Sequence, residues 1–244
     1  VMNPIRAKGE RCIVCDVGGE FVARFYREGD VVLNPFDARS VSWSPLAEMA
    51  GEWDAERIAK SIIPDAEGNE GAWNGYAQSV VAAVLVKLWQ GDGNNGELLR
   101  LLTRAPMPEL KEFIAGTPAE GMFTKDDSAM VASFMGIIAS SIKPYQYLDP
   151  SAGIDAFSVR QFVANEGTNW LFLNFTDSQF ASLKPIIAAV LDIAISACLE
   201  LKPDQNRRCW FMLDELASYG FLGSLRSLLE KGAKQLLVSI ALRE

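Results

Sequence analysis

The chain has 244 residues, of which 49% are hydrophobic and 22% charged, a balance that excludes disordered, collagen-like and coiled-coil proteins. This length allows one or two domains with a core that needs neither disulfides nor metal. The formal net charge of −8 argues against a free-standing nucleic-acid binder, because phosphate contacts dominate the affinity of such proteins. The absence of histidine excludes His-based triads, metal ligands and proton shuttles.

Neither a membrane span nor a signal peptide is predicted. The longest charge-free stretch, residues 71–86, is shorter than the roughly 20 apolar residues that a spanning helix needs. The first residues lack the apolar core of a signal peptide. The opening Val1-Met2-Asn3-Pro4 leads us to expect the interior of a longer protein.

Two buried strands are predicted within the first 50 residues. The apolar run Cys12–Asp16 is followed by Gly18-Gly19, and the run Val31–Leu33 is stopped by Asn34-Pro35. The first run contains a CxxC pair, which also occurs in zinc and redox sites. Positions i and i+3 of a strand point to opposite faces, so we predict buried, reduced thiols instead. The same is expected of the remaining cysteines, Cys198 and Cys209. This use of cysteine fits a reducing cytoplasm.

From about residue 53 the pattern changes to that of helices, and no convincing strand follows until residue 169. Helical spacing, prolines and glycines predict five helices in this block, 53–62, 72–90, 97–103, 108–115 and 126–142. A further helix is expected at 155–164. Strands and helices then alternate, with strands at 169–175, 209–213 and 236–242 and helices at 182–201 and 222–231.

This order of elements predicts an α/β fold, a parallel sheet with helical crossovers that an all-α insertion interrupts. We expect one domain made of residues 1–50 and 151–244, and an inserted all-α domain at 51–150. Ligands of such sheets bind at the carboxyl ends of the strands. The polar residues expected at that edge are Asp16, Thr176, Asp177, Asp214 and Glu215.

The run Cys209–Glu215 matches the Walker B pattern of apolar residues followed by Asp-Glu. A carboxylate at the strand end, here Asp214, can hold Mg²⁺, and the adjacent Glu215 can orient the water that attacks a terminal phosphate. The alternative is a buried strand whose Asp214 caps the next helix. The sequence of the run does not decide between the two.

Two further features have simpler interpretations. The segment Asp16–Glu20 carries two glycines and two acids, but it lacks the lysine of a phosphate loop, and GxxxxGK[ST] occurs nowhere in the chain. A plain strand-exit turn is the default interpretation. Four tryptophans lie at or within the helical block, and tryptophan can stack on bases, but without basic neighbours we favour packing in the core or against a partner. They are Trp43, Trp53, Trp73 and Trp89.

Taken together, several motifs resemble one family. The motifs are Asp16–Glu20, Leu33–Arg39 with Trp43, Trp170–Leu173, and Asp214–Ser218 with the helix and Gly232 that follow. In this order they resemble the coupling-protein ATPases of conjugative type IV secretion, the motors that feed plasmid DNA to the export channel. The resemblance covers nearly the whole chain.

This resemblance implies a RecA-like, P-loop nucleotide-binding domain with an inserted all-α domain. It also implies ATP and Mg²⁺ as cofactors, a hexameric ring, and a membrane anchor that holds the protein at the cytoplasmic face of the bacterial inner membrane. The implied partners are single-stranded DNA with its relaxase and the proteins of the secretion channel. In this setting Asp214 would help hold Mg²⁺, Glu215 would polarise the hydrolytic water, and Asp16 and Glu20 would support the nucleotide site or a subunit contact.

The chain departs from the family pattern at three points. The phosphate loop would precede Val1, Ala233 stands where an Arg is usual, and Arg243 stands where a nucleotide-sensing Gln is usual. The 244 residues alone are therefore predicted to be inactive as an ATPase. An alternative is a non-enzymatic module that docks the relaxosome or other substrates and has a decayed nucleotide site. A ring translocase outside secretion is a third possibility, which the Asn34–Asp37 element disfavours.

Overall fold

The computed structural model describes residues 2–66, 68–123, 128–202, 204, 207–214 and 238–243. The chain forms two compact units, 1–41 with 159–244 and 42–158, here called the α/β unit and the helical unit. From the sequence we expected the junctions near residues 50 and 150, whereas the compact units meet at 41/42 and 158/159.

Contacts within the helical unit explain where its two ends lie. Phe157 N–H donates to the carbonyl of Ser42 at 2.9 Å. The carboxylate of Glu48, only 1% exposed, accepts from Trp43 Nε1 at 2.7 Å and from Ser158 Oγ at 3.0 Å. The segments on either side of the insertion are thus joined to each other, and both belong to the helical unit.

The α/β unit contains a five-stranded sheet in the order β2-β3-β1-β4-β5, and every neighbouring pair is parallel. The strands are β1 (Arg11–Val17), β2 (Val31–Val32), β3 (Trp170–Phe175), β4 (Cys209–Asp214) and β5 (Val238–Arg243). Parallel strands buried on both faces read as continuous apolar runs, which is why the sequence shows them clearly. The predicted α/β class with a parallel sheet is confirmed.

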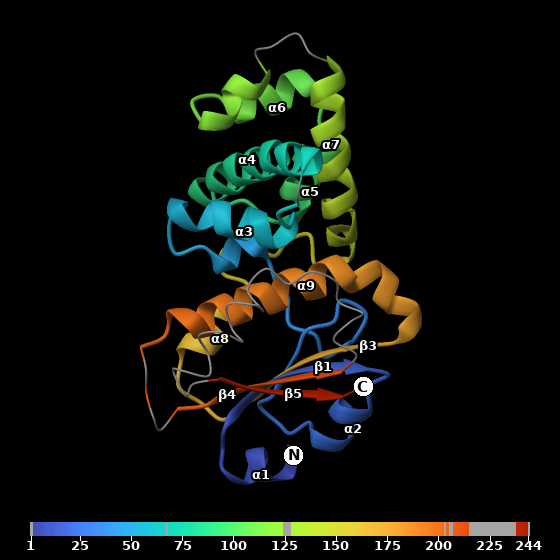
Figure 1. The fold of residues 1–244 in the computed structure, drawn as a ribbon, viewed down its shortest axis with the longest axis vertical. Helices are drawn as coiled ribbons and strands as arrows, with labels where there is room; N and C mark the ends of the chain where they lie inside the picture. Colours follow the sequence, from blue (N-terminus) through green and yellow to red (C-terminus); the bar gives the residue numbers. More distant parts are fainter. Residues whose placement is uncertain are drawn as a thin grey trace. The chain divides into compact units, whose positions relative to one another are not determined.

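Helices cover both faces of this sheet (Figure 1). They are α1 (Met2–Ala7) and α2 (Glu20–Phe25) on one face, and α8 (Val159–Ala164) and α9 (Asp177–Glu200) on the other. The α1–α2 side encloses a core that includes Ile5, Val14 and Trp170. The two short helices were not predicted, because six residues carry too little periodicity. The predicted helix at 222–231 lies outside the described residues.

Helix α9 begins five residues before the predicted start at 182. Gln179 Oε1 accepts the backbone N–H of Thr176 at 3.1 Å, the reciprocal half of a capping box that fixes the first turn. By length and composition α9 is apolar enough to cross a membrane, the single such helix among the residues described, yet 61% of its most apolar window is buried within the structure. This burial is that of a core helix in an α/β layer.

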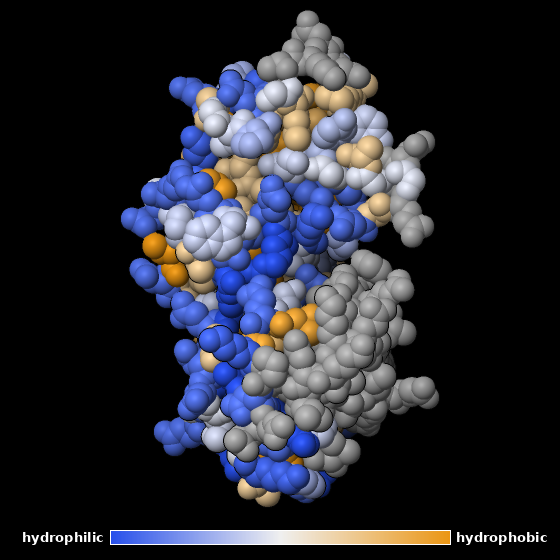
Figure 2. Space-filling model, turned by 60° about the vertical axis from the view of Figure 1, so that its left-hand side comes forward, coloured by the Kyte–Doolittle hydropathy of each residue, from blue (hydrophilic) through white to orange (hydrophobic). Residues whose placement is uncertain are grey.

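The helical unit is built around the long helix α4, which packs against α3, α5 and α7. Its α-helices are α3 (Ala55–Ile62), α4 (Asn69–Gln90), α5 (Asn95–Thr103), α6 (Met107–Phe113) and α7 (Ser128–Ile142). Short 3₁₀ segments are Pro45–Glu48, Glu52–Asp54, Pro118–Phe123 and Lys143–Tyr147. Trp43 is in its core at 1% exposure, as predicted, whereas Trp53 is 77% exposed. On the face drawn in Figure 2, hydrophilic residues predominate and smaller apolar areas lie among them.

All four cysteines are free and buried, so the predicted buried thiols are confirmed. Cys12 belongs to the core on the α1–α2 side of the sheet. Cys15, three positions along β1, points to the opposite face because side chains alternate along a strand. No group of three or more potential metal ligands occurs among the residues described by the structure.

Candidate functional site at the carboxyl edge of the sheet

The carboxyl ends of the parallel strands converge on one edge of the α/β unit. Asp16 of β1 is in register with Asn174 of β3, and Cys15 with Leu213 of β4. Asp16 and Asp214 therefore end neighbouring strands, and Asp214 is itself in register with Arg243 of β5. The structure brings these predicted residues to the same edge, whereas Glu215 lies outside the described residues.

Asp16 organises the turn that follows β1. Its side chain is fully buried, and Oδ2 accepts the backbone N–H of Val22 at 2.7 Å. Gly18 and Gly19 have φ angles of 86° and 78°, a left-handed conformation that glycine adopts without steric cost. Gly18 N–H also donates to the carbonyl of Phe175 at 2.8 Å. The predicted strand-exit turn is thus present, and the exposed Glu20 opens helix α2 just after it.

The loop after β2 is folded by Asn34. This side chain is 4% exposed, and its Oδ1 accepts the backbone N–H of Phe36 at 3.0 Å, a local turn that Asn commonly forms. Its Nδ2 donates to Oε1 of Gln179 on α9 at 3.5 Å. Ser40 Oγ accepts the backbone N–H of Asn34 at 3.0 Å, so the loop is closed on itself and joined to α9.

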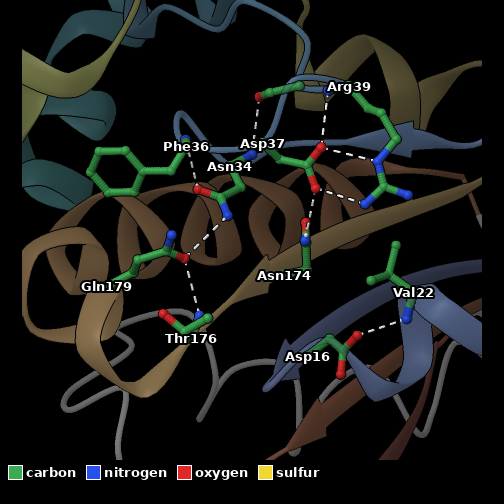
Figure 3. A network of polar contacts seen from close by, with 10 residues as sticks. Asp16, Val22, Asn34, Phe36, Asp37, Arg39, Asn174, Thr176 and Gln179 are labelled. Carbon is green, nitrogen blue, oxygen red and sulfur yellow. Dashed lines mark hydrogen bonds and ion pairs between the residues drawn. The ribbon is translucent and has the colours of Figure 1, made fainter.

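Asp37 is the centre of a second group of contacts. Oδ1 accepts the backbone N–H and Nε of Arg39 at 2.9 and 3.0 Å. Oδ2 accepts Nη2 of Arg39 at 2.7 Å and Nδ2 of Asn174 at 3.1 Å. Hydrogen bonds from Arg39, with a smaller contribution from Asn174, hold the pKa of the Asp37 carboxyl well below its ordinary value. Figure 3 shows Asp37 between Arg39 and Asn174, with Asn34 and Gln179 turned toward each other.

These side chains surround a pocket of about 380 Å³ at the carboxyl ends of β1, β2 and β3. Its lining is formed by Gly18, Gly19, Asn34, Phe36, Asp37, Ala38, Asn174, Phe175, Thr176 and Gln179. The volume falls within the range of pockets that hold small ligands, about 300–1,000 Å³. Oδ1 of Asn174 is buried and has no hydrogen-bond partner within the described part of the chain.

Sequence reasoning did not assemble this pocket. The Asn34–Asp37 element was noticed for its resemblance to a family, without a chemical role. Asn174 and Gln179 were not singled out, although the spacing of Thr176 and Gln179 is that of a capping box and would have placed a helix start at this edge. The contact between Asp37 and Asn174 spans 137 positions of sequence, and no local pattern reveals it.

Comparison with known proteins decides the family. Residues 1–236 match the family model described as the type IV secretion-system coupling protein DNA-binding domain. The chain belongs to this family. Coupling protein TraD of Escherichia coli (strain K12) is 28% identical over 243 residues, which are 95% of this chain and 33% of TraD.

Solved structures of the bacterial conjugative coupling protein TrwB are also similar. The unbound monoclinic form of TrwBdeltaN70 matches with a TM-score of 0.87 and 28% identity over 97% of this chain and 56% of that one. TrwB in complex with ADP and Mg²⁺ has the same TM-score, 29% identity, and coverage of 97% and 57%. TrwB was also solved with the non-hydrolysable ATP analogue ADPNP, again with a TM-score of 0.87 and 28% identity, over 97% of this chain and 58% of that one.

Three statements follow from these matches. The RecA-like fold with a helical domain, which the resemblance implied, is confirmed by the likeness to TrwB. The chain spans about a third of the length of TraD and just over half of the TrwB chains. The family membership predicted from the motifs is confirmed as well.

Proposed function

We propose that this chain acts within a conjugative coupling protein, an ATP-driven motor that links the relaxosome to a type IV secretion channel. The observation that carries the proposal is the parallel sheet that ends at Asp214, in a chain matching the coupling-protein family over residues 1–236. ATP with Mg²⁺ is the proposed cofactor, in keeping with the nucleotide complexes of TrwB.

The residues at the carboxyl edge fit such a cofactor. Asp214 ends β4 between two parallel neighbours, β1 and β5, the position at which α/β sheets present ligand-binding groups. We assign Asp214 to holding Mg²⁺ and Glu215 to polarising the attacking water. When bound, Mg²⁺ would neutralise charge that develops on the phosphates. Asp16 and Glu20 are assigned to supporting the nucleotide site or a subunit contact, Asp16 through the turn that it fixes.

The proposed partners follow from the family. They are single-stranded DNA with its relaxase, the proteins of the secretion channel, and further copies of the same protein in a hexameric ring. The proposed location is the cytoplasmic face of the bacterial inner membrane. The helical unit is assigned to recognition of the relaxosome or of secreted substrates.

A mating assay with Glu215→Gln, in the protein that carries this chain, tests the proposal. Gln keeps the size of the side chain but loses the charge that polarises water, and removing such a group lowers turnover about 10²–10⁴-fold. We expect ATP binding to persist while ATP turnover and plasmid transfer fall together. The matched control is Glu166→Gln, which alters an exposed carboxylate in the segment before β3 and should leave both unchanged. Transfer at the normal frequency with Glu215→Gln would refute the motor and favour the docking module.

A further inference from the structure

We propose that a groove on the helical unit docks the apolar face of an amphipathic helix from a protein partner. The groove has a volume of about 700 Å³ and is formed by residues 52–60, by one face of α4 and by the turn at 116–119. All three segments belong to the helical unit, in which α4 lies between α3 and α6 (Figure 1). That the partner belongs to the relaxosome or to the secreted substrates rests on the proposed function.

The floor of the groove consists of small side chains on α4. Gly75 and Ser79 are one turn apart, and Ala82 and Ala83 follow on the next turn. The Ser79 hydroxyl donates to the carbonyl of Gly75 at 2.9 Å, so it needs no partner from a ligand. A Cβ added at Gly75 would meet no atom within 4 Å, which shows that the space above this end of the floor is open.

The shape of the floor suits a helix that lies along it. From Gly75 to Val86 the floor is roughly 16 Å long, the length of about three helical turns. Two packed helices have axes about 8–10 Å apart, depending on the side chains between them. Small residues on α4 therefore allow a second helix to come close enough for its own apolar side chains to fill the groove.

Trp53 supplies an apolar anchor beside the floor. This residue is 77% exposed and lines the groove. The sequence left packing in the core or against a partner open for Trp53, and the structure excludes the core. A Cβ added at Gly51 would overlap the six-membered ring of Trp53, so the indole lies against Gly51 before a partner arrives. Tryptophan is enriched among the few residues that dominate binding energy at protein interfaces.

The charges that line the groove have both signs. Glu52 accepts a hydrogen bond from the last residue of α4 at 2.6 Å, and Lys60 lies 3.5 Å from Asp65. Glu56 and Lys87 also line the groove, and neither has a hydrogen bond or an ion pair within the described part of the chain. An occupant that pairs with both must carry one basic and one acidic group.

This arrangement of charge selects the chemistry of the occupant. A nucleic acid presents negative phosphates, which Glu52 and Glu56 would repel, and its affinity comes mainly from cations. Lys87 is the one cation of the described lining without a partner. A purely apolar ligand would leave both Glu56 and Lys87 unpaired. A helix with apolar residues every three to four positions, flanked by one basic and one acidic side chain, fits the floor and the charges together.

Fluorescence anisotropy with a synthetic peptide on the 244-residue chain tests the proposal. The probe is a labelled, alanine-based peptide of about 14 residues, held helical by a side-chain bridge because helices of this length are marginal in water. Its leucines share one face, beside one lysine and one glutamate. The reference peptide has the same composition, but its leucines are spread around the helix. We expect the first peptide to bind about tenfold more tightly or better, which is the gain from burying one more leucine.

Two glycine substitutions test the floor without disturbing the fold. Gly75→Leu fills the open space above the floor, and leucine is a better helix former than glycine. The variant should therefore fold, and its binding of the peptide should be lost. Gly136→Leu is the matched control, because Gly136 lies on α7, outside the described lining, and a Cβ added there also meets no atom within 4 Å. Its binding should equal that of the unmodified chain.

Further variants test the anchor and the charges. Trp53→Ala should weaken binding about 30-fold or more, the loss typical of an interface hot spot. Tyr76→Ala, which removes an exposed ring of α4 outside the described lining, should leave binding unchanged. Glu56→Gln and Lys87→Gln should each make binding less dependent on salt, because each removes one charge that the peptide pairs with.

Several outcomes would overturn the assignment. Equal binding of the two peptides, or full binding by Gly75→Leu, would show that no helix face is held here. A short single strand of DNA that binds the unmodified chain but not Gly75→Leu would assign the groove to nucleic acid. Dimerisation of the chain that Gly75→Leu abolishes would assign it to a second copy. Because no ATP and no mating step is involved, failure here is distinct from failure of the proposed motor, which the Glu215→Gln variant tests.

Discussion

Replacing Asp37 by Asn should destabilise the α/β unit by an amount that its contacts allow us to estimate. The two hydrogen bonds to Oδ2, from Arg39 Nη2 at 2.7 Å and Asn174 Nδ2 at 3.1 Å, would lose their acceptor. The side chain of Arg39 is 46% exposed, so water replaces its ion pair at a cost of about 0–1 kcal/mol. Asn174 is half-buried, and an unsatisfied donor there costs about 1–3 kcal/mol.

The sum is about 1–4 kcal/mol, which corresponds to a melting temperature about 2–16 °C lower for a chain of this size. Calorimetry at pH 7 measures this shift. Arg39→Lys serves as the matched variant, because it keeps the charge but loses the forked geometry, and it should cost less than Asp37→Asn. An Asp37→Asn chain as stable as the unmodified one would refute the reasoning that the carboxylate holds Asn174 in place.

Acid should remove the same stabilisation, and the direction follows from the pKa of Asp37. Hydrogen bonds from Arg39 and Asn174 lower that pKa in the folded chain below its ordinary value. A carboxyl of this kind stabilises the fold at pH values above its unfolded pKa of about 3.9, and this contribution is lost as the pH falls through the folded pKa. The difference between the unmodified chain and Asp37→Asn should therefore be constant from about pH 8 to 5 and shrink below about pH 4. A difference that grows on acidification would contradict the assignment.

Two further predictions concern the fold and the chemistry. Arg6→Met should lower stability by about 3–5 kcal/mol, because it leaves the buried carboxylate of Asp30 without its ion-pair partner. Arg100→Met, at an exposed pair with Glu97, should cost far less, because water screens the pair. Urea titration of both variants checks the contrast, and equal losses would contradict it. The purified 244-residue chain should hydrolyse no ATP, because it contains no GxxxxGK[ST] loop to cradle the phosphates. A phosphate-release assay checks this, and steady release that Glu215→Gln abolishes would show the prediction to be wrong.

Sequence reasoning located the sheet better than it located the pocket. The strands β1 and β3 were predictable because they are buried on both faces and read as apolar runs, as in Ile13–Cys15 of β1. The helices α1 and α2 were missed, because segments of six residues lack a measurable period and are held in place by tertiary contacts. One such contact joins α1 to β3: the guanidinium carbon of Arg6 lies 3.7 Å from the centroid of the Trp170 ring.

The limits of sequence reasoning are different for the site. Asp16 was expected at the carboxyl edge because a strand ends there, and the structure places it at that edge. Its hydrogen bond to the Val22 N–H depends on the left-handed conformation of Gly18 and Gly19, which a pair of glycines permits but does not specify. The pocket is lined by side chains from three separate segments of the chain. These segments come together because of the order of the strands in the sheet, and no local sequence pattern reveals that order.

Strand order also connects the pocket with the proposed nucleotide site. Among the described strands, β1 alone pairs with both β3 and β4, so it lies between the strand that carries Asn174 and the strand that ends at Asp214. The turn after β1 is held by Asp16 on one side and by the bond from Gly18 N–H to the Phe175 carbonyl on the other. Gly18 and Gly19 in turn line the pocket. The buried carboxylate of Asp16 is thus placed between the pocket and the proposed nucleotide site, and it acts at this edge by holding the turn after β1.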